Sequence, residues 1–107
     1  MTDFHDRERA EEAHFAHDEE MNFRIHARRN KLLGQWAAER MGLSAAEAES
    51  YAKAVVQADF EEAGDEDVVR KLLGDLTAAG VETTESEVRT ALEAKLVEAR
   101  RALMGEA

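Results

Sequence analysis

The chain contains no cysteine and no proline, and only 6% of its 107 residues are aromatic. Without cysteine, disulfides, thiolate metal sites and cysteine nucleophiles are excluded. Without proline, nothing in the sequence forces a break in a long helix. No run of about 18 apolar residues occurs, so no transmembrane helix is expected. The N-terminus is acidic and lacks the apolar core of a signal peptide, which predicts a soluble, cytoplasmic protein.

Acidic residues dominate the charge that is present, with 24 Asp and Glu against 14 Lys and Arg and a net charge of −10. Such a chain is a poor general binder of nucleic acid, because phosphate binding needs a basic surface. Ala, Glu, Lys, Leu and Arg together make up 60 of the 107 residues, a composition typical of helices. The length suits a single domain.

Glycines and helix-capping motifs divide the chain into helices. Gly42, Gly64, Gly80 and Gly105 each follow a helical pattern, where glycine most easily adopts the left-handed closing conformation. Capping boxes begin at Ser44 and Thr84, and three carboxylates open the segment after Gly64. Apolar residues recur at spacings of three and four. We therefore predict an all-α fold, a small four-helix bundle in 21–107, with helices at about 21–41, 44–63, 66–79 and 85–104.

Residues 1–20 differ from the rest because they carry eight acidic side chains against Arg7 and Arg9. Apart from Met1, their only large apolar residues are Phe4 and Phe15. These are eleven residues apart and would share one side of a helix. Two rings are too few to hold such a segment on its own bundle, so we expect a mobile tail or frayed helix that a partner could order.

The following segment, 21–41, is basic, with Arg24, Arg28, Arg29, Lys31 and Arg40 opposed only by Glu39. Arg29 falls near an apolar stripe, which is most simply explained by a stem that covers apolar surface and a guanidinium that reaches water or a carboxylate. The alternative is an anion-binding patch. Its candidate residues are Arg24, Arg28, Arg29 and Lys31.

Catalytic and metal-binding motifs are weak. All four histidines (His5, His14, His17 and His26) lie in the first quarter, far from any serine, which disfavours serine–histidine catalysis. His14 and His17 share a helical face but lack further ligands, so neither a metal nor another cofactor is expected. A response of the tail to pH through its histidines is a more plausible role. The aromatic residues Trp36, Tyr51 and Phe60 are interpreted as core.

The acidic start of the helix after Gly64 lacks the spacing of a calcium loop, and no phosphate-binding glycine loop occurs. The residues thus predict a small helical regulator that offers a helix to a partner, not an enzyme.

The sequence also has a specific likeness to one family. Its densest stretches are Phe4–Ala10, Glu12–Glu20, Ala27–Gly34, Trp36–Ala38 and Asp59–Lys71. These resemble the zeta-type inhibitor subunit of alphaproteobacterial F-type ATP synthases, a family once catalogued only as a domain of unknown function.

The resemblance implies a four-helix protein that inhibits ATP hydrolysis by the rotary enzyme. Its N-terminal segment, mobile in the free protein, would become helical on entering an α/β catalytic interface of the head beside the γ stalk. The protein would associate with the inner membrane only peripherally, through the synthase. By resemblance, the inhibitory residues are Phe4, Asp6, Arg7, Glu8, Arg9, Glu12 and Phe15.

Two other functions stay open. The basic segment could bind ATP, ADP or another small anion weakly, or the bundle could be an adaptor for an unrelated complex. The free protein is expected to be a monomer, because the bundle is small and highly charged.

Overall fold

The computed structural model describes the backbone of residues 3–61 and 64–105 and the side chains of residues 19–59 and 64–105. It contains four helices and, in the described part, no strand. Their bounds are α1 Asp3–Arg40, α2 Ala45–Glu61, α3 Asp65–Ala78 and α4 Glu85–Leu103. The predicted all-α class and the number of helices are confirmed.

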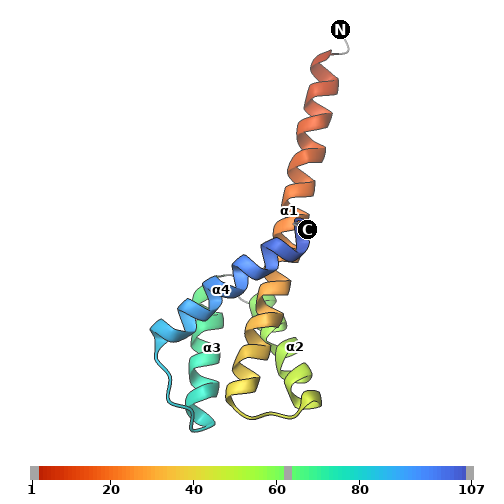
Figure 1. Cartoon of the computed structure of the whole chain (residues 1–107). Coiled ribbons are helices and arrows are strands. Elements are labelled where there is room, and N and C mark those ends of the chain that lie inside the picture. Colours follow the sequence, from red (N-terminus) through yellow and green to blue (C-terminus); the bar gives the residue numbers. More distant parts are fainter. Residues whose placement is uncertain (1–2, 62–63, 106–107) are drawn as a thin grey trace.

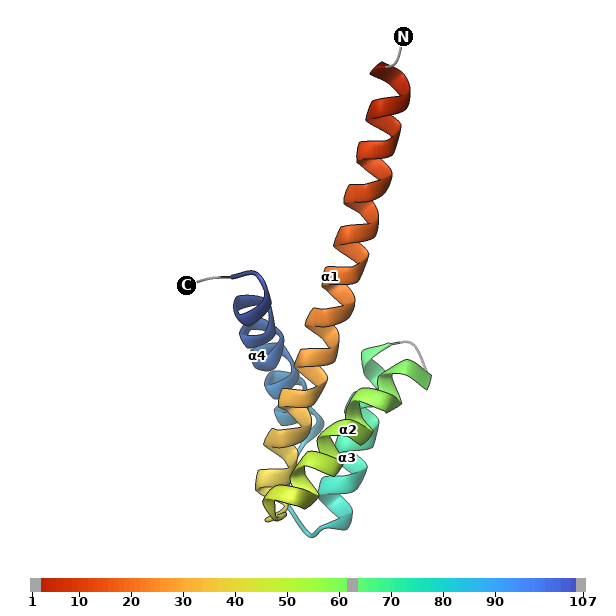
Figure 2. The same ribbon diagram turned by 90° about the vertical axis from the view of Figure 1, so that its right-hand side faces the viewer.

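Helix α1 is the longest element, with 38 residues and an expected length of about 57 Å. Helices α2 and α4 both pack against its C-terminal half, and α3 fills the space beside them (Figure 1). The N-terminal half of α1 continues away from this body without a break, which a second view confirms (Figure 2). Helix α1 therefore begins at Asp3, because nothing in the sequence interrupts it. The division of the chain into a tail, 1–20, and a domain, 21–107, stays a prediction.

The core lies where the four helices meet. Its side chains recur at spacings of three and four along each helix, as the apolar pattern predicts. Trp36 and Tyr51 pack at its edge and are partly buried, which confirms them as core residues. The side chain of Phe60 lies outside the described residues. The fully buried hydrophobic residues include Leu33, Val55, Val68, Leu72, Leu76 and Val88.

The turn between α1 and α2 is built from the residues that predicted it. Gly42 has a φ of 72°, and the N–H of Leu43 donates to the Ala38 carbonyl, which closes α1 in a Schellman motif. At the start of α2, the Ser44 N–H donates to the Glu47 carboxylate (2.9 Å) and the Glu47 N–H donates to the Ser44 hydroxyl (3.2 Å). The first predicted capping box is confirmed.

The second predicted capping box is only half formed. The Thr84 hydroxyl accepts from the Glu87 N–H, as predicted. Within the described residues, however, the Glu87 carboxylate accepts from the Thr83 hydroxyl at 3.2 Å and not from the Thr84 N–H. The same carboxylate lies 3.9 Å from the Arg40 guanidinium, so it links α4 to the end of α1.

Helices α1 and α2 approach each other most closely at Gly34. A Cβ atom at this position would lie 2.7 Å from the Cα of Ala52, a distance that real Cβ atoms do not tolerate. Glycine is therefore required in the middle of α1 for packing, although it lowers intrinsic helix stability.

Candidate functional site

The residues assigned to the inhibitory segment occupy the N-terminal half of α1. The structure gives them a helical backbone that is continuous with the basic segment and the bundle. They are Phe4, Asp6, Arg7, Glu8, Arg9, Glu12 and Phe15. Their side chains lie outside the described residues, so their contacts remain a prediction.

Arg29 is the most buried charged side chain of the described part, with 1% of its surface exposed. Its Nη1 lies 2.9 Å from the Asp65 carboxylate, and its Nε and Nη2 donate to the Asn30 side-chain oxygen at 3.0 and 2.9 Å. The predicted contact of this guanidinium with a carboxylate is confirmed. The Asn30 amide nitrogen is buried and has no partner among the described residues.

This buried ion pair joins two elements. Asp65 is the first residue of α3, so its carboxylate also sits at the positive end of that helix dipole. Gly64, which precedes it, offers no side chain to cap the helix. The Arg29 guanidinium therefore fixes the start of α3 against α1, with all three of its nitrogens in contact with Asp65 or Asn30.

The other three candidate anion-binding residues are exposed. The Arg24 guanidinium lies 2.7 Å from the Glu20 carboxylate one helical turn away. Arg28 and Lys31 have no ion pair among the described residues. Arg28 and Lys31 are thus the accessible members of the candidate patch that lack an ion pair with any described side chain, and Arg29 is separated from them.

Unpaired cations are few among the side chains that the structure describes. Twelve of the residues with described side chains are Lys or Arg, and eight of them form ion pairs. The four in the described part without one are Arg28, Lys31, Arg100 and Arg101. The chain has a net charge of −10, and within its described part Lys31 is one of only four Lys or Arg side chains without an ion pair.

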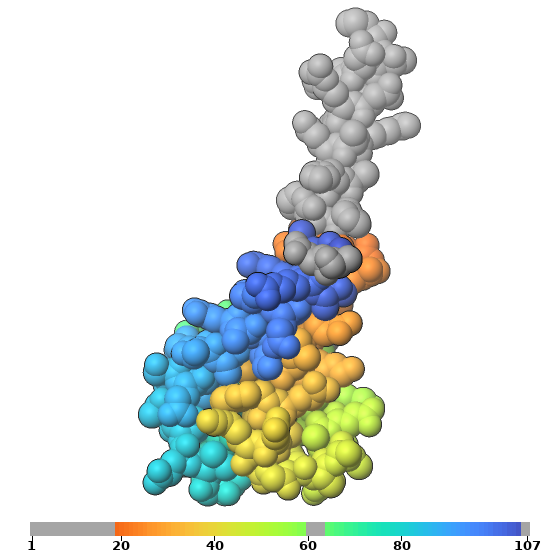
Figure 3. Space-filling view, viewed as in Figure 1, coloured from red at the N-terminus to blue at the C-terminus, as the bar shows by residue number. Residues whose placement is uncertain are grey.

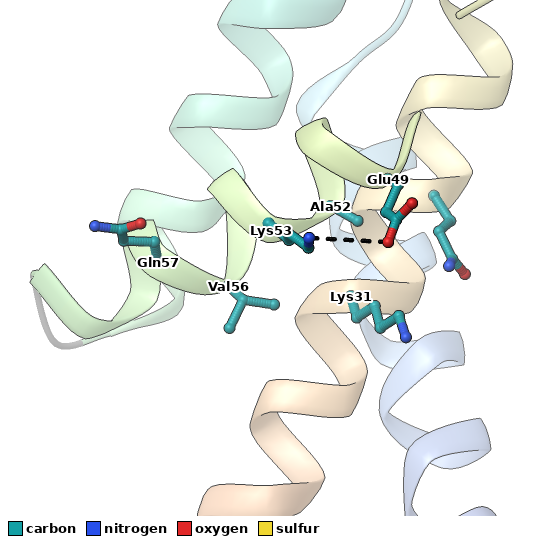
Figure 4. Close-up of a pocket in the computed structure, with 7 residues that line it drawn as sticks. Lys31, Glu49, Ala52, Lys53, Val56 and Gln57 are labelled. Carbon is teal, nitrogen blue, oxygen red and sulfur yellow. Dashed lines mark ion pairs between the residues drawn. The ribbon is translucent and has the colours of Figure 1, made fainter. Parts of the chain in front are cut away.

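Lys31 also lines a groove of about 570 Å³ between α1 and α2 (Figure 4). Ala52 and Val56 of α2 supply apolar surface, and Gln35, Glu49, Lys53 and Gln57 supply polar groups. The space-filling view shows how the C-terminal half of α1 stays accessible between its neighbours (Figure 3). The groove was not predicted, because it depends on how two helices cross.

A second, smaller crevice of about 310 Å³ lies between α1 and the junction of α2 and α3. His26 lines it together with Asn30, Asp59 and Asp65. The structure describes no group of three or more metal-binding side chains anywhere in its described part. His5, His14 and His17 have side chains outside the described residues, so the hypothesis of a pH response stays a prediction.

Tyr51, Asp75 and Lys71 form a polar contact between α2 and α3 that the sequence did not reveal. The Tyr51 hydroxyl donates to the Asp75 carboxylate at 2.7 Å, and the Lys71 ammonium lies 3.1 Å from the same carboxylate. Burial, the hydrogen bond and the charge of Asp75 raise the pKa of Tyr51 well above its usual value. Because Tyr51 and Asp75 are far apart in sequence, no local pattern could have paired them.

Taken together, the geometry is that of an all-helical protein in which one long helix presents its N-terminal half and a compact body holds the other half. A family model described as ATPase inhibitor subunit zeta matches residues 1–102. The chain therefore belongs to this family of ATPase inhibitors, and it is a regulatory subunit and not an enzyme.

Among solved structures, a solution NMR structure shares 52% sequence identity with this chain. The match covers 81% of this chain and 99% of that one, with a TM-score of 0.70. No curated protein matches the chain. No helix in the described part is long and apolar enough to cross a membrane.

Proposed function

We propose that this protein inhibits ATP hydrolysis by the F-type ATP synthase through insertion of its N-terminal segment into an α/β catalytic interface beside the γ stalk. Membership of the inhibitor family supports the activity. The observation that carries the mechanism is the unbroken helix α1, which extends from Asp3 into the bundle. It offers a single helical rod whose far end is free of α2, α3 and α4.

The register of α1 favours this mode of binding. Positions 4 and 15 lie on the same side of the helix. Position 33 lies on that side too, because it follows position 15 after five full turns of an ideal helix. Leu33 is fully buried in the core. The side of α1 that α2–α4 cover in the body thus continues into the N-terminal half, where a partner would cover it.

The body limits how far the helix can enter. A helix with its side chains is about 10–12 Å wide. The molecule measures 30 and 24 Å across its two shorter axes. In this proposal the bundle stops against the outer surface of the head, while the inserted helix blocks rotation of the γ stalk without taking part in any chemistry.

Phe4 and Phe15 are proposed as apolar anchors, and the charged residues between them as partners of interface charges. Two buried aromatic anchors could contribute several kcal/mol of binding free energy, about 2–4 kcal/mol each. Ordering of about fifteen residues would offset part of this gain.

The anchors are tested by steady-state ATP hydrolysis of the purified cognate catalytic head. Phe4→Ala combined with Phe15→Ala should raise the concentration needed for half inhibition by a factor of about 100 or more. Phe23→Ala is the matched control, since Phe23 lies on the same helix beyond the segment and is 55% exposed. The anchor proposal fails if the double variant inhibits as well as the wild type.

The partners in this proposal are the α, β and γ subunits, and the protein would sit at the inner membrane only through the synthase. Weak nucleotide binding is the second proposal, supported by Arg28 and Lys31, which are exposed and form no ion pair in the described part of the chain. NMR titration of the chain with ATP, ADP and plain phosphate tests it. Shifts at these two residues with a nucleotide but not with phosphate are expected, and unchanged spectra would contradict it.

A further inference from the structure

The groove between α1 and α2 has the features of a docking site for a short acidic helix. Its apolar surface comes from Ala52 and Val56, and lysines stand on both sides, Lys31 on α1 and Lys53 on α2 (Figure 4). Lys31 has no ion pair within the described part of the chain. The Lys53 ammonium lies 3.8 Å from the Glu49 carboxylate in a pair that is more than two-thirds exposed on both sides, a weak constraint.

The chain itself contains a segment of matching chemistry. Residues 1–20 carry eight carboxylates against Arg7 and Arg9, together with Phe4 and Phe15. An acidic helix with two aromatic residues complements an apolar groove flanked by lysines.

In the structure, the chain does not place this segment in its own groove. Helix α1 is continuous from Asp3 to Arg40, so its N-terminal half points away from the body that carries the groove (Figure 2). The segment of a second copy can reach the groove without any break in α1.

We infer that two copies of this chain associate with their α1 helices antiparallel, each N-terminal segment lying over the α1/α2 groove of the other. The arrangement is a symmetric, self-complementary contact. A parallel pairing is disfavoured, because it would set the acidic half against the acidic half and the basic half against the basic half.

The antiparallel register brings one of the two aromatic positions, position 4, to the groove, while position 15 lies beyond the groove. When position 4 lies opposite 31–35, beside the groove, position 15 lies opposite 20–24. Positions 6 and 8 then lie opposite 27–33, a stretch that contains the unpaired Arg28 and Lys31. Near the centre, Glu19 and Glu20 of the two copies approach each other, and this repulsion keeps the association weak and the chain monomeric at low concentration.

The association is tested by charge exchange on the full chain, with sedimentation velocity from about 10 μM to about 1 mM. One variant carries Asp6→Lys and Glu8→Lys, and the other carries Lys31→Glu and Lys53→Glu. Each alone should self-associate at least about tenfold more weakly than the wild type, since like charges then face each other. A mixture of the two should regain association, because both contacts of the mixed pair become complementary.

Arg100→Glu combined with Arg101→Glu is the matched control. It changes the net charge by the same amount as the groove variant but lies on α4, outside the groove. It should associate as the wild type does. A wild type that stays monomeric up to the highest concentration, or variants that self-associate unchanged, would overturn the inference.

A second measurement locates the contact. Because the chain has no cysteine, Ala10→Cys gives a single attachment point for a spin label. Mixed with an isotope-labelled, unmodified copy, it should broaden the amide signals of residues 25–29 most strongly, because the register places position 10 opposite them, and leave those of Thr77 and Thr83 sharp. Neither measurement involves the ATP synthase, so the association can fail while the proposed inhibition holds, and the reverse.

If both hold, the self-associated form hides the inhibitory segment. This consequence rests on the proposed function. It predicts that inhibitor added from a concentrated stock gains potency with time after dilution, whereas the same inhibitor kept beforehand at low concentration inhibits at once.

Discussion

At the residue scale, the buried Arg29 carries a structural role that a surface arginine would not. A guanidinium with 1% exposure needs its hydrogen-bond partners, and the structure supplies them from Asn30 and from Asp65 of α3. Removal of one partner of such a pair leaves a buried charge without compensation, which costs more than the pair itself contributes. The half-exposed state of Asp65 moderates that cost.

Asp65→Ala is therefore expected to lower the free energy of unfolding by about 2 kcal/mol or more. Urea denaturation followed by circular dichroism measures it. Asp67→Ala is the matched control in the same helical turn, because the partner of Asp67 is the exposed Arg70. Equal losses of unfolding free energy in the two variants would show that the contact between Arg29 and Asp65 does not add to stability beyond an exposed ion pair.

The second prediction at this scale concerns the two glycines inside helices. Gly34→Ala should lower the free energy of unfolding by about 1–3 kcal/mol, because the new methyl group meets the Ala52 backbone at 2.7 Å. Gly74→Ala should instead stabilise the protein by about 0.5–1 kcal/mol, since nothing lies within 4 Å of its added Cβ. Thermal denaturation of both variants separates the two effects. A stabilised Gly34→Ala would contradict the close approach of α1 and α2.

At the scale of elements, helix starts depend on charges that titrate. Hydrogen bonds from the Ser44 N–H and hydroxyl hold the pKa of Glu47 below its usual 4.5. The Arg89 guanidinium lowers the pKa of Glu66 in the same way and joins the start of α3 to α4 at 2.7 Å. These carboxylates therefore stabilise the fold most in their charged form.

Glu47→Gln tests the sign of this effect. Because the pKa is lower in the folded chain, the contribution of Glu47 is complete above pH 4.5 and is lost as the pH falls below it. The gap in unfolding free energy between wild type and variant should thus be largest near pH 7 and close in acid. A gap that stays constant across this range would mean that the charge of Glu47 is not the stabilising feature.

Most of the helices and their ends were predictable from local patterns in the sequence. Apolar spacing, the glycines that end helices and the Ser44 capping box act within a few residues, and the structure confirms them. The contacts between helices were not predictable. Arg29 was expected to meet a carboxylate, but its choice of Asp65 depends on how α3 packs. The groove and the close approach at Gly34 depend on the crossing of α1 and α2, which periodicity does not encode.

On the scale of the whole molecule, the protein divides into a body and a projecting half-helix. The long axis of 66 Å exceeds the other two by more than a factor of two because α1 is unbroken (Figure 1). In the proposed function, the projecting half-helix would supply the contact with the enzyme, and the body would limit how deeply it enters. The N-terminal half of α1 is then the part whose removal should abolish the function.

ATP hydrolysis by the purified cognate catalytic head, with full-length protein and with a version that lacks residues 1–20, tests this account most directly. Circular dichroism and denaturation of the shortened chain establish that its bundle is still folded. The account predicts inhibition by the full-length protein and none by the folded, shortened one. Equal inhibition by both would place the inhibitory site on the bundle and contradict the proposed insertion of the N-terminal segment.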